Sequence, residues 1–160
     1  MDQKRLDNSG KSGIMELYRR DKNIGAFSEL KIPMQKRAIK RVCKKYGVDI
    51  SEINIKIQRS EEFLGKEIIY FGSTDYDNVG RIDLFPNAFA DEEQLIRTII
   101  HEKCHVMQIK RYGKEYAQAN LNEMELQAYR FEDIFMKLSK RGCEYYAQLE
   151  QYNDKPVSWC

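Results

Sequence analysis

The only two histidines of the 160-residue chain, His101 and His105, are four residues apart, and Glu102 lies between them. On a helix, a spacing of four places both imidazoles on one face about one turn apart, so their nitrogens can converge on one cation. Two neutral imidazoles can hold Zn²⁺ in this way, and a carboxylate beside them can act as a general base toward water. The alternative is that this five-residue pattern arose by chance on a surface helix.

The stretch from residue 91 to 112 has the pattern of a buried helix that would carry both histidines. Asp91 followed three residues later by Gln94 is a capping-box pattern, which predicts where the helix begins. Gly113 predicts where it ends. The apolar face of the helix is broad and consists of Leu95, Ile96, Ile99, Ile100, Val106 and Met107. We place the two histidines at one edge of that face, where the pair and its glutamate are hard to explain by packing alone.

A catalytic zinc site needs a third protein ligand, and without a third histidine or a cysteine pair this ligand must be a carboxylate. The next predicted helix, at about residues 120–141, offers Glu125 beside its apolar stripe. A buried glutamate is costly unless a cation compensates its charge. Glu132, two turns further on a similar face, could instead orient a histidine, whereas Glu123 falls on the solvent side. The alternative is that Glu125 is an ordinary surface residue in an i,i+4 contact.

The segments before these helices predict a small sheet and one supporting helix. Helical spacing of apolar residues from Pro33 onward, with Lys and Arg on the other side, predicts an amphipathic helix that ends at Gly47. Three strands are predicted, at residues 53–57, 68–71 and 81–85. We expect a turn at residues 72–80, the last two strands antiparallel, and Pro86 as the end of the last strand. The expected fold class is α+β, with a short mixed sheet packed on the histidine helix and the following glutamate-bearing helix.

Composition and length limit the domain organisation. A hydrophobic content of 42% over 160 residues suits one globular core. We expect residues 1–13, which are polar, to form a mobile arm and residues 14–160 to form a single domain. No run of about 18 apolar residues and no apolar leader is present, so we expect a cytoplasmic protein without a membrane span, or a piece of a longer one.

The cysteines and the charge distribution suggest no second kind of site. The four cysteines, at positions 43, 104, 143 and 160, form no Cys-x-x-Cys pair, so we expect reduced thiols, with Cys104 packed in the core.

Residues 1–45 carry 13 Lys and Arg but only 5 Asp and Glu. Such a basic part could face nucleic acid or an acidic partner. We favour a solvated helix face and do not expect nucleic acid as a partner, because no aromatic-interleaved binding motif accompanies the basic residues. We expect no membrane partner either, because no apolar span is present.

The histidine motif and the glutamate segment together resemble a known class of peptidase. HEKCH at residues 101–105, followed after an intervening turn by ELQAYRFE at residues 125–132, is similar to the HExxH…E arrangement of gluzincin metallopeptidases. The E-x-x-A-x-x-F part is most similar to the ImmA/IrrE-type peptidases of bacteria and their mobile elements, and the resemblance covers about residues 82–136. It implies a zincin-like fold and hydrolysis of peptide bonds in a protein or peptide substrate. The implied zinc ligands are His101, His105 and Glu125, with Glu102 as general base.

The chain departs from these families in two places. The leucine-rich, proline-ended segment that commonly follows the glutamate helix in ImmA/IrrE-type proteins is replaced by residues 134–137, and Tyr129 stands where the thermolysin-like pattern has aspartate. Peptide hydrolysis also needs a donor for the oxyanion, and no spare histidine is present. Tyr129 is our first candidate and Tyr112 or Tyr116 the next, with a structural role as the alternative for each.

A second likeness concerns the origin of the chain. Residues 8–14 are similar to segments that precede C-terminal effector domains of phage head-morphogenesis proteins, which suggests a mobile-element source. The alternative to an enzyme is therefore a non-catalytic phage or mobile-element protein that retains a zincin fold for assembly or binding. The oligomeric state stays open on the sequence alone.

Overall fold

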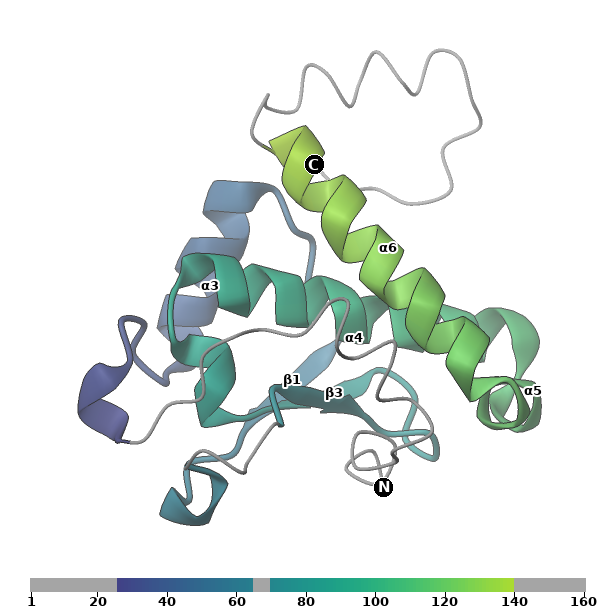
Figure 1. Ribbon diagram of the computed structural model, residues 1–160, viewed down its shortest axis with the longest axis horizontal. Coiled ribbons are helices and arrows are strands. Elements are labelled where there is room, and N and C mark those ends of the chain that lie inside the picture. Colours follow the sequence, from purple (N-terminus) through teal and green to yellow (C-terminus); the bar gives the residue numbers. More distant parts are fainter. Residues whose placement is uncertain (1–25, 65–69, 140–160) are drawn as a thin grey trace.

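In this computed structural model, the described residues, 26–64 and 70–139, form four α-helices and a three-stranded sheet (Figure 1). The helices are α3 (Lys36–Tyr46), α4 (Glu92–Tyr112), α5 (Lys114–Ala119) and α6 (Leu121–Ser139). The strands are β1 (Asn54–Ile57), β2 (Gly72–Thr74) and β3 (Arg81–Leu84), and the 3₁₀ turns are η2 (Phe27–Glu29), η3 (Glu61–Phe63) and η4 (Pro86–Phe89). The expected α+β class is confirmed. The arm predicted at residues 1–13 and the chain at 14–25, 65–69 and 140–160 lie outside the described residues.

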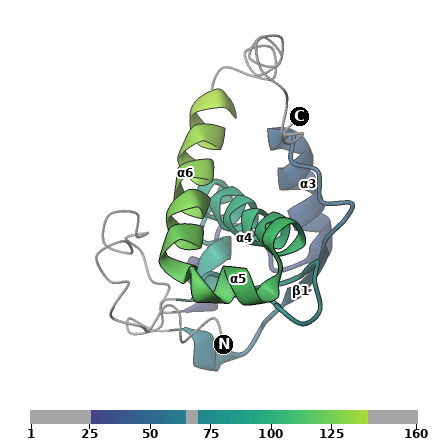
Figure 2. The ribbon, with the colours of Figure 1, turned by 90° about the vertical axis from the view of Figure 1, so that its right-hand side faces the viewer.

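Helix α4 is the central element of the described chain. It contacts α3, α5, α6, η4 and both strands β2 and β3, and Figure 2 shows α3 and α6 on two sides of it. Its residues Leu95, Ile96 and Ile99 are completely buried. The carboxylate of Asp91 accepts a hydrogen bond from Gln94 N at 2.8 Å, so the helix begins at the predicted N-cap. None of the helices in the described ranges combines the length and apolar character that a membrane span requires.

The sheet has the strand order β1, β3, β2 and is mixed, as predicted. β1 runs parallel to β3, with Ile55 opposite Ile82, and β2 runs antiparallel to β3, with Thr74 opposite Ile82. The second strand, however, begins later than predicted. Of the predicted residues 68–71, residues 68 and 69 lie outside the described part of the chain, and Tyr70 and Phe71 are not in a strand. β2 lies at Gly72–Thr74, within the stretch expected to be a turn. Side-chain β-propensity pointed to residues 68–71, whereas pairing with β3 and close packing on α4 select the residues that follow. The turn begins at Asp75, whose carboxylate accepts from two backbone amides.

One helix boundary and one connection also differ from the prediction. α3 begins at Lys36 and not at Pro33, because Gln35 N donates to Pro33 O at 2.8 Å and closes a turn before the helix. Its end at Gly47 is confirmed, since Gly47 has a φ of 75° and its amide bonds the last carbonyls. The predicted turn between the two site helices is wrong: it contains α5. Gly113, with a φ of 91°, separates α4 from α5, and buried Ala117 packs α5 against the end of α4.

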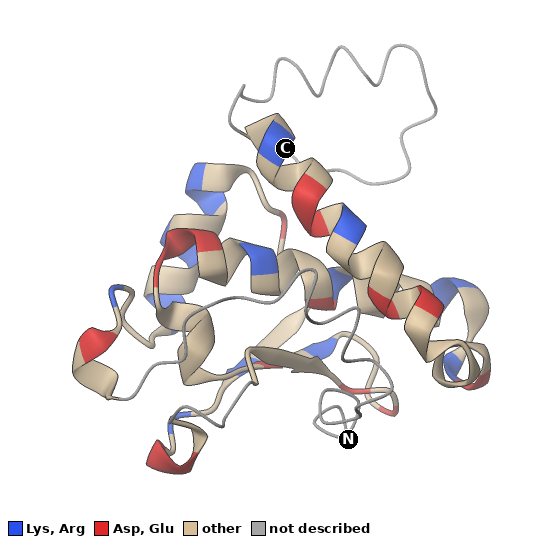
Figure 3. Ribbon diagram, in the orientation of Figure 1, with Lys and Arg blue, Asp and Glu red and all other residues tan. Residues whose placement is uncertain are grey.

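The exposed face of α3 carries most of the basic residues that the structure describes within positions 1–45 (Figure 3). The exposed cations of the helix are Lys36, Arg37, Lys40, Arg41, Lys44 and Lys45. Lys45 pairs with Glu92 at 2.8 Å. The opposite face of α3, formed by Ala38, Ile39, Val42 and Cys43, is buried. This is an amphipathic arrangement in which the cations meet solvent, as the sequence predicted.

The two cysteines in the described ranges, Cys43 and Cys104, are buried free thiols. Burial raises the pKa of each thiol to about 12, so only about one molecule in ten thousand carries a thiolate at pH 8. In a variant with Cys143 and Cys160 changed to serine, we expect iodoacetamide to label neither thiol of the native protein at pH 8 and to label both after unfolding. Rapid labelling of native Cys104, followed by mass spectrometry, would contradict its packing in the core.

Candidate metal centre

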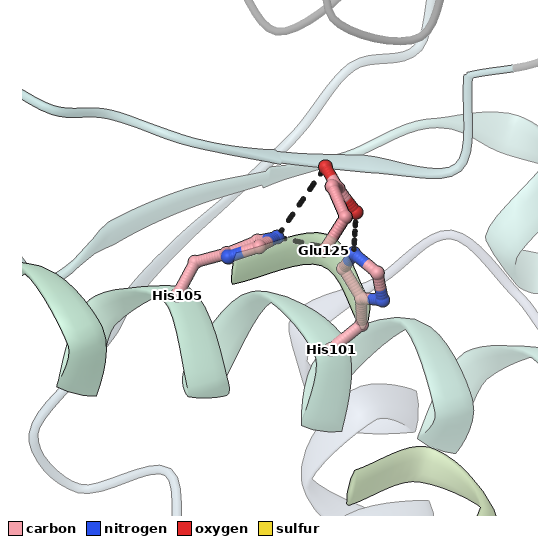
Figure 4. Close-up of side chains that lie close together, drawn as sticks. All are labelled: His101, His105 and Glu125. Atoms are coloured by element: carbon pink, nitrogen blue, oxygen red, sulfur yellow. Dashed lines mark hydrogen bonds and ion pairs between the residues drawn. The ribbon is translucent and has the colours of Figure 1, made fainter. Parts of the chain in front are cut away.

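Three buried side chains, His101, His105 and Glu125, converge between α4 and α6 (Figure 4). His101 Nε2 lies 2.9 Å from Glu125 Oε1 and 3.1 Å from His105 Nε2, and His105 Nε2 lies 3.6 Å from Glu125 Oε2. One ligand atom from each residue lies within 4.8 Å of the others, so this group could hold a metal ion. Two imidazole nitrogens and a carboxylate oxygen form a donor set that catalytic zinc sites use.

Helix periodicity and helix packing together bring these three residues to one point. The spacing of four puts both histidines on the face of α4 that meets α6. On α6, Glu125 is 1% exposed and Ala128, one turn further, is completely buried, so a small side chain lies on the same face as the carboxylate. Glu123 is exposed, as expected from its place on the other side of the helix.

Glu132 holds the outer nitrogen of His101. Its Oε2 lies 2.6 Å from His101 Nδ1, and a carboxylate at this position accepts the Nδ1 proton and directs Nε2 toward Glu125. The contact that the sequence suggested for Glu132 is therefore present. Arg97, which sequence reasoning missed, lies 3.5 Å from Glu132 Oε1 and 3.0 Å from Asp133 Oδ1. It places one positive charge beside a carboxylate that is 2% exposed.

Gln108 has the equivalent place at His105 and was also missed from the sequence. Its Nε2 donates to Met124 O at 3.1 Å and to Gln127 Oε1 at 3.0 Å, which fixes the orientation of the amide. Gln108 Oε1 therefore faces His105 Nδ1, at 2.8 Å, and accepts its proton. The other ring nitrogen of His105, Nε2, lies 3.6 Å from Glu125 Oε2, on the side of the converging group. The only sequence signal was the i+3 position of Gln108 relative to His105.

The charge state of His101 follows from its carboxylate neighbours. Burial by itself lowers the pKa of His101, but Glu125 and Glu132 outweigh this effect and raise that pKa to about 10. At neutral pH the imidazole of the metal-free protein is therefore protonated and donates from both nitrogens. A cation that binds at Nε2 must displace that proton, because a ligating histidine is neutral.

Glu102 directly follows His101 on α4, and its carboxylate contacts the sheet. It is 3% exposed, and its Oε1 accepts a hydrogen bond from the hydroxyl of Thr74, on β2, at 2.5 Å. Gly72, two residues before Thr74, passes so close that a Cβ there would lie 3.0 Å from Glu102 Cγ. The carboxylate is thus packed between α4 and β2. Neither Gly72 nor Thr74 was a candidate from the sequence, because the strand itself was placed elsewhere.

The tyrosines proposed as oxyanion donors fall into two groups. The ring of Tyr129 packs edge-on against His101, with 4.6 Å between ring centroids, and is 2% exposed. Tyr112 and Tyr116 are 43% and 45% exposed and pack against each other. Tyr129 is therefore the tyrosine of the three that contacts a converging side chain. Cys104 is buried and lies outside the group that could hold a metal.

Removing the partner of His105 is expected to weaken metal binding. Gln108→Leu keeps an apolar side chain of similar size but removes the acceptor for His105 Nδ1, so the ring is free to rotate or change tautomer. We expect zinc affinity to fall about 10- to 100-fold, measured by competition with a chromophoric chelator. Gln118→Leu, at an exposed position of α5, is the matched control and should bind zinc like the wild type. Equal affinity in both variants would show that Gln108 does not orient the ring.

Comparison of the chain with protein-family models, with curated proteins and with solved structures finds no match. The arrangement of a small mixed sheet against α4, with α6 also packed on α4, is compatible with a zincin-like domain. The family resemblance therefore rests on the residues of the two motifs, and the function has to be argued from the site itself.

Proposed function

We propose that this protein is a zinc-dependent metallopeptidase with a zincin-like fold that hydrolyses peptide bonds in a protein or peptide substrate. The observation that supports the proposal best is the convergence of His101, His105 and Glu125, with Glu102 held beside them on α4. Three protein ligands leave one position of a tetrahedral zinc for water or substrate. A carboxylate that is near the ion without being one of these ligands is what general-base catalysis requires.

The proposed mechanism assigns a separate task to each side chain. His101, His105 and Glu125 would hold zinc, which when bound polarises a carbonyl and lowers the pKa of water. Glu102 takes the proton of the attacking water and passes it to the leaving amine. Tyr129, whose ring packs on His101, is the proposed donor to the oxyanion.

The first test is metal content followed by peptide cleavage. Protein purified without added metal is expected to contain about one equivalent of zinc, measured by elemental mass spectrometry. The same sample is incubated with a library of unstructured peptides, and cleavage is read by mass spectrometry. We expect 1,10-phenanthroline to stop cleavage and added zinc to restore it. A protein that takes up no zinc even when zinc is supplied would overturn the proposal.

The burial of the site favours one other candidate function, a non-catalytic protein in which the metal has a structural role. His101, Glu102, His105 and Glu125 are between 1% and 4% exposed, and structural zinc sites are closed to solvent. Such a protein would use the fold for assembly or binding. A fully zinc-loaded sample that cleaves no library peptide but unfolds at lower temperature without zinc would support this candidate over the peptidase.

A further inference from the structure

The carboxylate of Glu102 is held by a residue from outside the two metal-binding helices. The Thr74 hydroxyl donates a short hydrogen bond to Glu102 Oε1, with 2.5 Å between the two oxygens. Both side chains are buried, at 4% and 3% exposure. The second contact of the hydroxyl, with Glu102 O at 3.3 Å, is longer, so the single proton lies on the bond to the carboxylate.

The backbone of β2 adds a steric constraint on the same carboxylate. A Cβ placed on Gly72 would lie 2.7 Å from Thr98 Cγ2 and 3.2 Å from Glu102 Oε2, so the strand fits there only with glycine. Gly72 and Thr74 are two residues apart and therefore face the same side of the strand. One oxygen of Glu102 is thus bonded to Thr74, and the other lies on the side of Gly72.

We propose that Thr74 is the positioning residue for the general base Glu102, an inference that rests on the proposed peptidase function. A glutamate side chain has three rotatable bonds, and holding it in one rotamer keeps its proton-accepting oxygen in one place. The partners of His101 and His105 come from α4 and α6, whereas this partner comes from the sheet. Thr74 therefore connects the position of β2 with the position of the base. It acts through Glu102.

Thr74→Val tests this role because it keeps the shape of the side chain and removes the hydroxyl. We expect kcat for peptide cleavage to fall about 10- to 100-fold, with KM within about twofold and zinc content unchanged. Thr74→Ser restores the donor and should bring kcat back to within about threefold of the wild type. Thr98→Val is the matched control, since the hydroxyl of Thr98 bonds only a carbonyl of its own helix, Gln94 O at 2.8 Å, and its kcat should stay within about twofold.

A binding measurement tests the same contact without turnover. Acetohydroxamate chelates zinc and gives up a proton that a neighbouring base accepts, so its affinity reports the placement of Glu102. We expect the zinc-loaded Thr74→Val variant to bind it about tenfold more weakly than the wild type and the Thr74→Ser variant to bind it normally.

The outcomes separate this inference from the peptidase proposal. An active wild type whose Thr74→Val variant has unchanged kcat would overturn the role of Thr74 alone. A zinc-loaded wild type that cleaves no peptide would overturn the peptidase proposal, and the acetohydroxamate affinities would then decide the role of Thr74. Equal affinities of the wild type and the Thr74→Val variant would overturn that role. Weaker binding by Thr74→Val, with normal binding by Thr74→Ser, would support it. A wild type that binds no zinc would overturn both.

Discussion

Replacing Glu102 by glutamine is expected to leave zinc bound and to abolish peptide hydrolysis. Glutamine has nearly the same shape, and its amide oxygen can still accept the hydrogen bond from Thr74, so the fold around β2 is kept. It cannot accept a proton from water at neutral pH. Loss of a positioned general base costs about 10²- to 10⁴-fold in rate, so kcat should fall by at least this factor in a peptide cleavage assay.

The control for this variant is Glu123→Gln, which makes the same chemical change at an exposed position of α6. It should have wild-type zinc content and wild-type kcat. If Glu102→Gln cleaved peptides at the normal rate, the base would have to be another group and the assigned role of Glu102 would be wrong. If it lost zinc, Glu102 would be a ligand, in contrast to its contact with the sheet.

Replacing Glu125 by alanine is expected to remove the metal. Glu125 supplies the carboxylate of the converging group, and two histidines alone are an incomplete site. Loss of an outer partner of a ligand costs about 10- to 100-fold in metal affinity, and loss of the ligand itself should cost more. Zinc content should fall from about one equivalent to a trace. At a zinc concentration about 1,000 times its dissociation constant, wild-type protein gains about 4 kcal/mol of stability from binding, and this gain should disappear in the variant.

Glu123→Ala provides the matched control, because it removes a glutamate two residues away on the same helix from an exposed position. Its zinc content and zinc-dependent rise in melting temperature should equal those of the wild type. His101→Ala should behave like Glu125→Ala. Comparing the metal-free proteins by thermal unfolding separates loss of metal from loss of fold. Zinc retained at one equivalent in Glu125→Ala would remove this residue from the ligand set.

Where the sequence contained a local signal, the prediction of the fold was accurate. The carboxylate of Asp91 accepts from Gln94 N and begins α4, and Gly113 ends it, as the capping pattern predicted. Gly47 ends α3 in a left-handed conformation. The alternation of isoleucines gave β1, in which Ile55 and Ile57 are buried. These features depend on residues within one or two turns of each other, so a single stretch of chain contains the physics that decides them.

Elements whose position is set by contacts with another part of the fold, or whose residues show little apolar periodicity, were harder to predict from the sequence. β2 carries Gly72 and Ser73, which have low strand propensity, and it forms because β3 offers hydrogen bonds and α4 leaves room only for a glycine. The start of α3 was displaced by a turn that follows Pro33. Helix α5 was missed because only Ala117 of its six residues is buried, so the segment has little apolar periodicity.

The sequence by itself determined which side chains could bind a metal and the spacing of the two histidines on one helix. A separation of four residues brings two imidazoles to one face of any α-helix, and the periodicity of α6 put Glu125 and Glu132 on its buried side. The tertiary structure alone decided that Glu125, 24 residues from His101, meets both histidines. It also decided that Thr74, 28 residues before Glu102, holds that carboxylate, and that Gln108 bonds His105 in an orientation set by α6. These contacts cross between elements, so they depend on how helices and sheet pack and not on any local pattern.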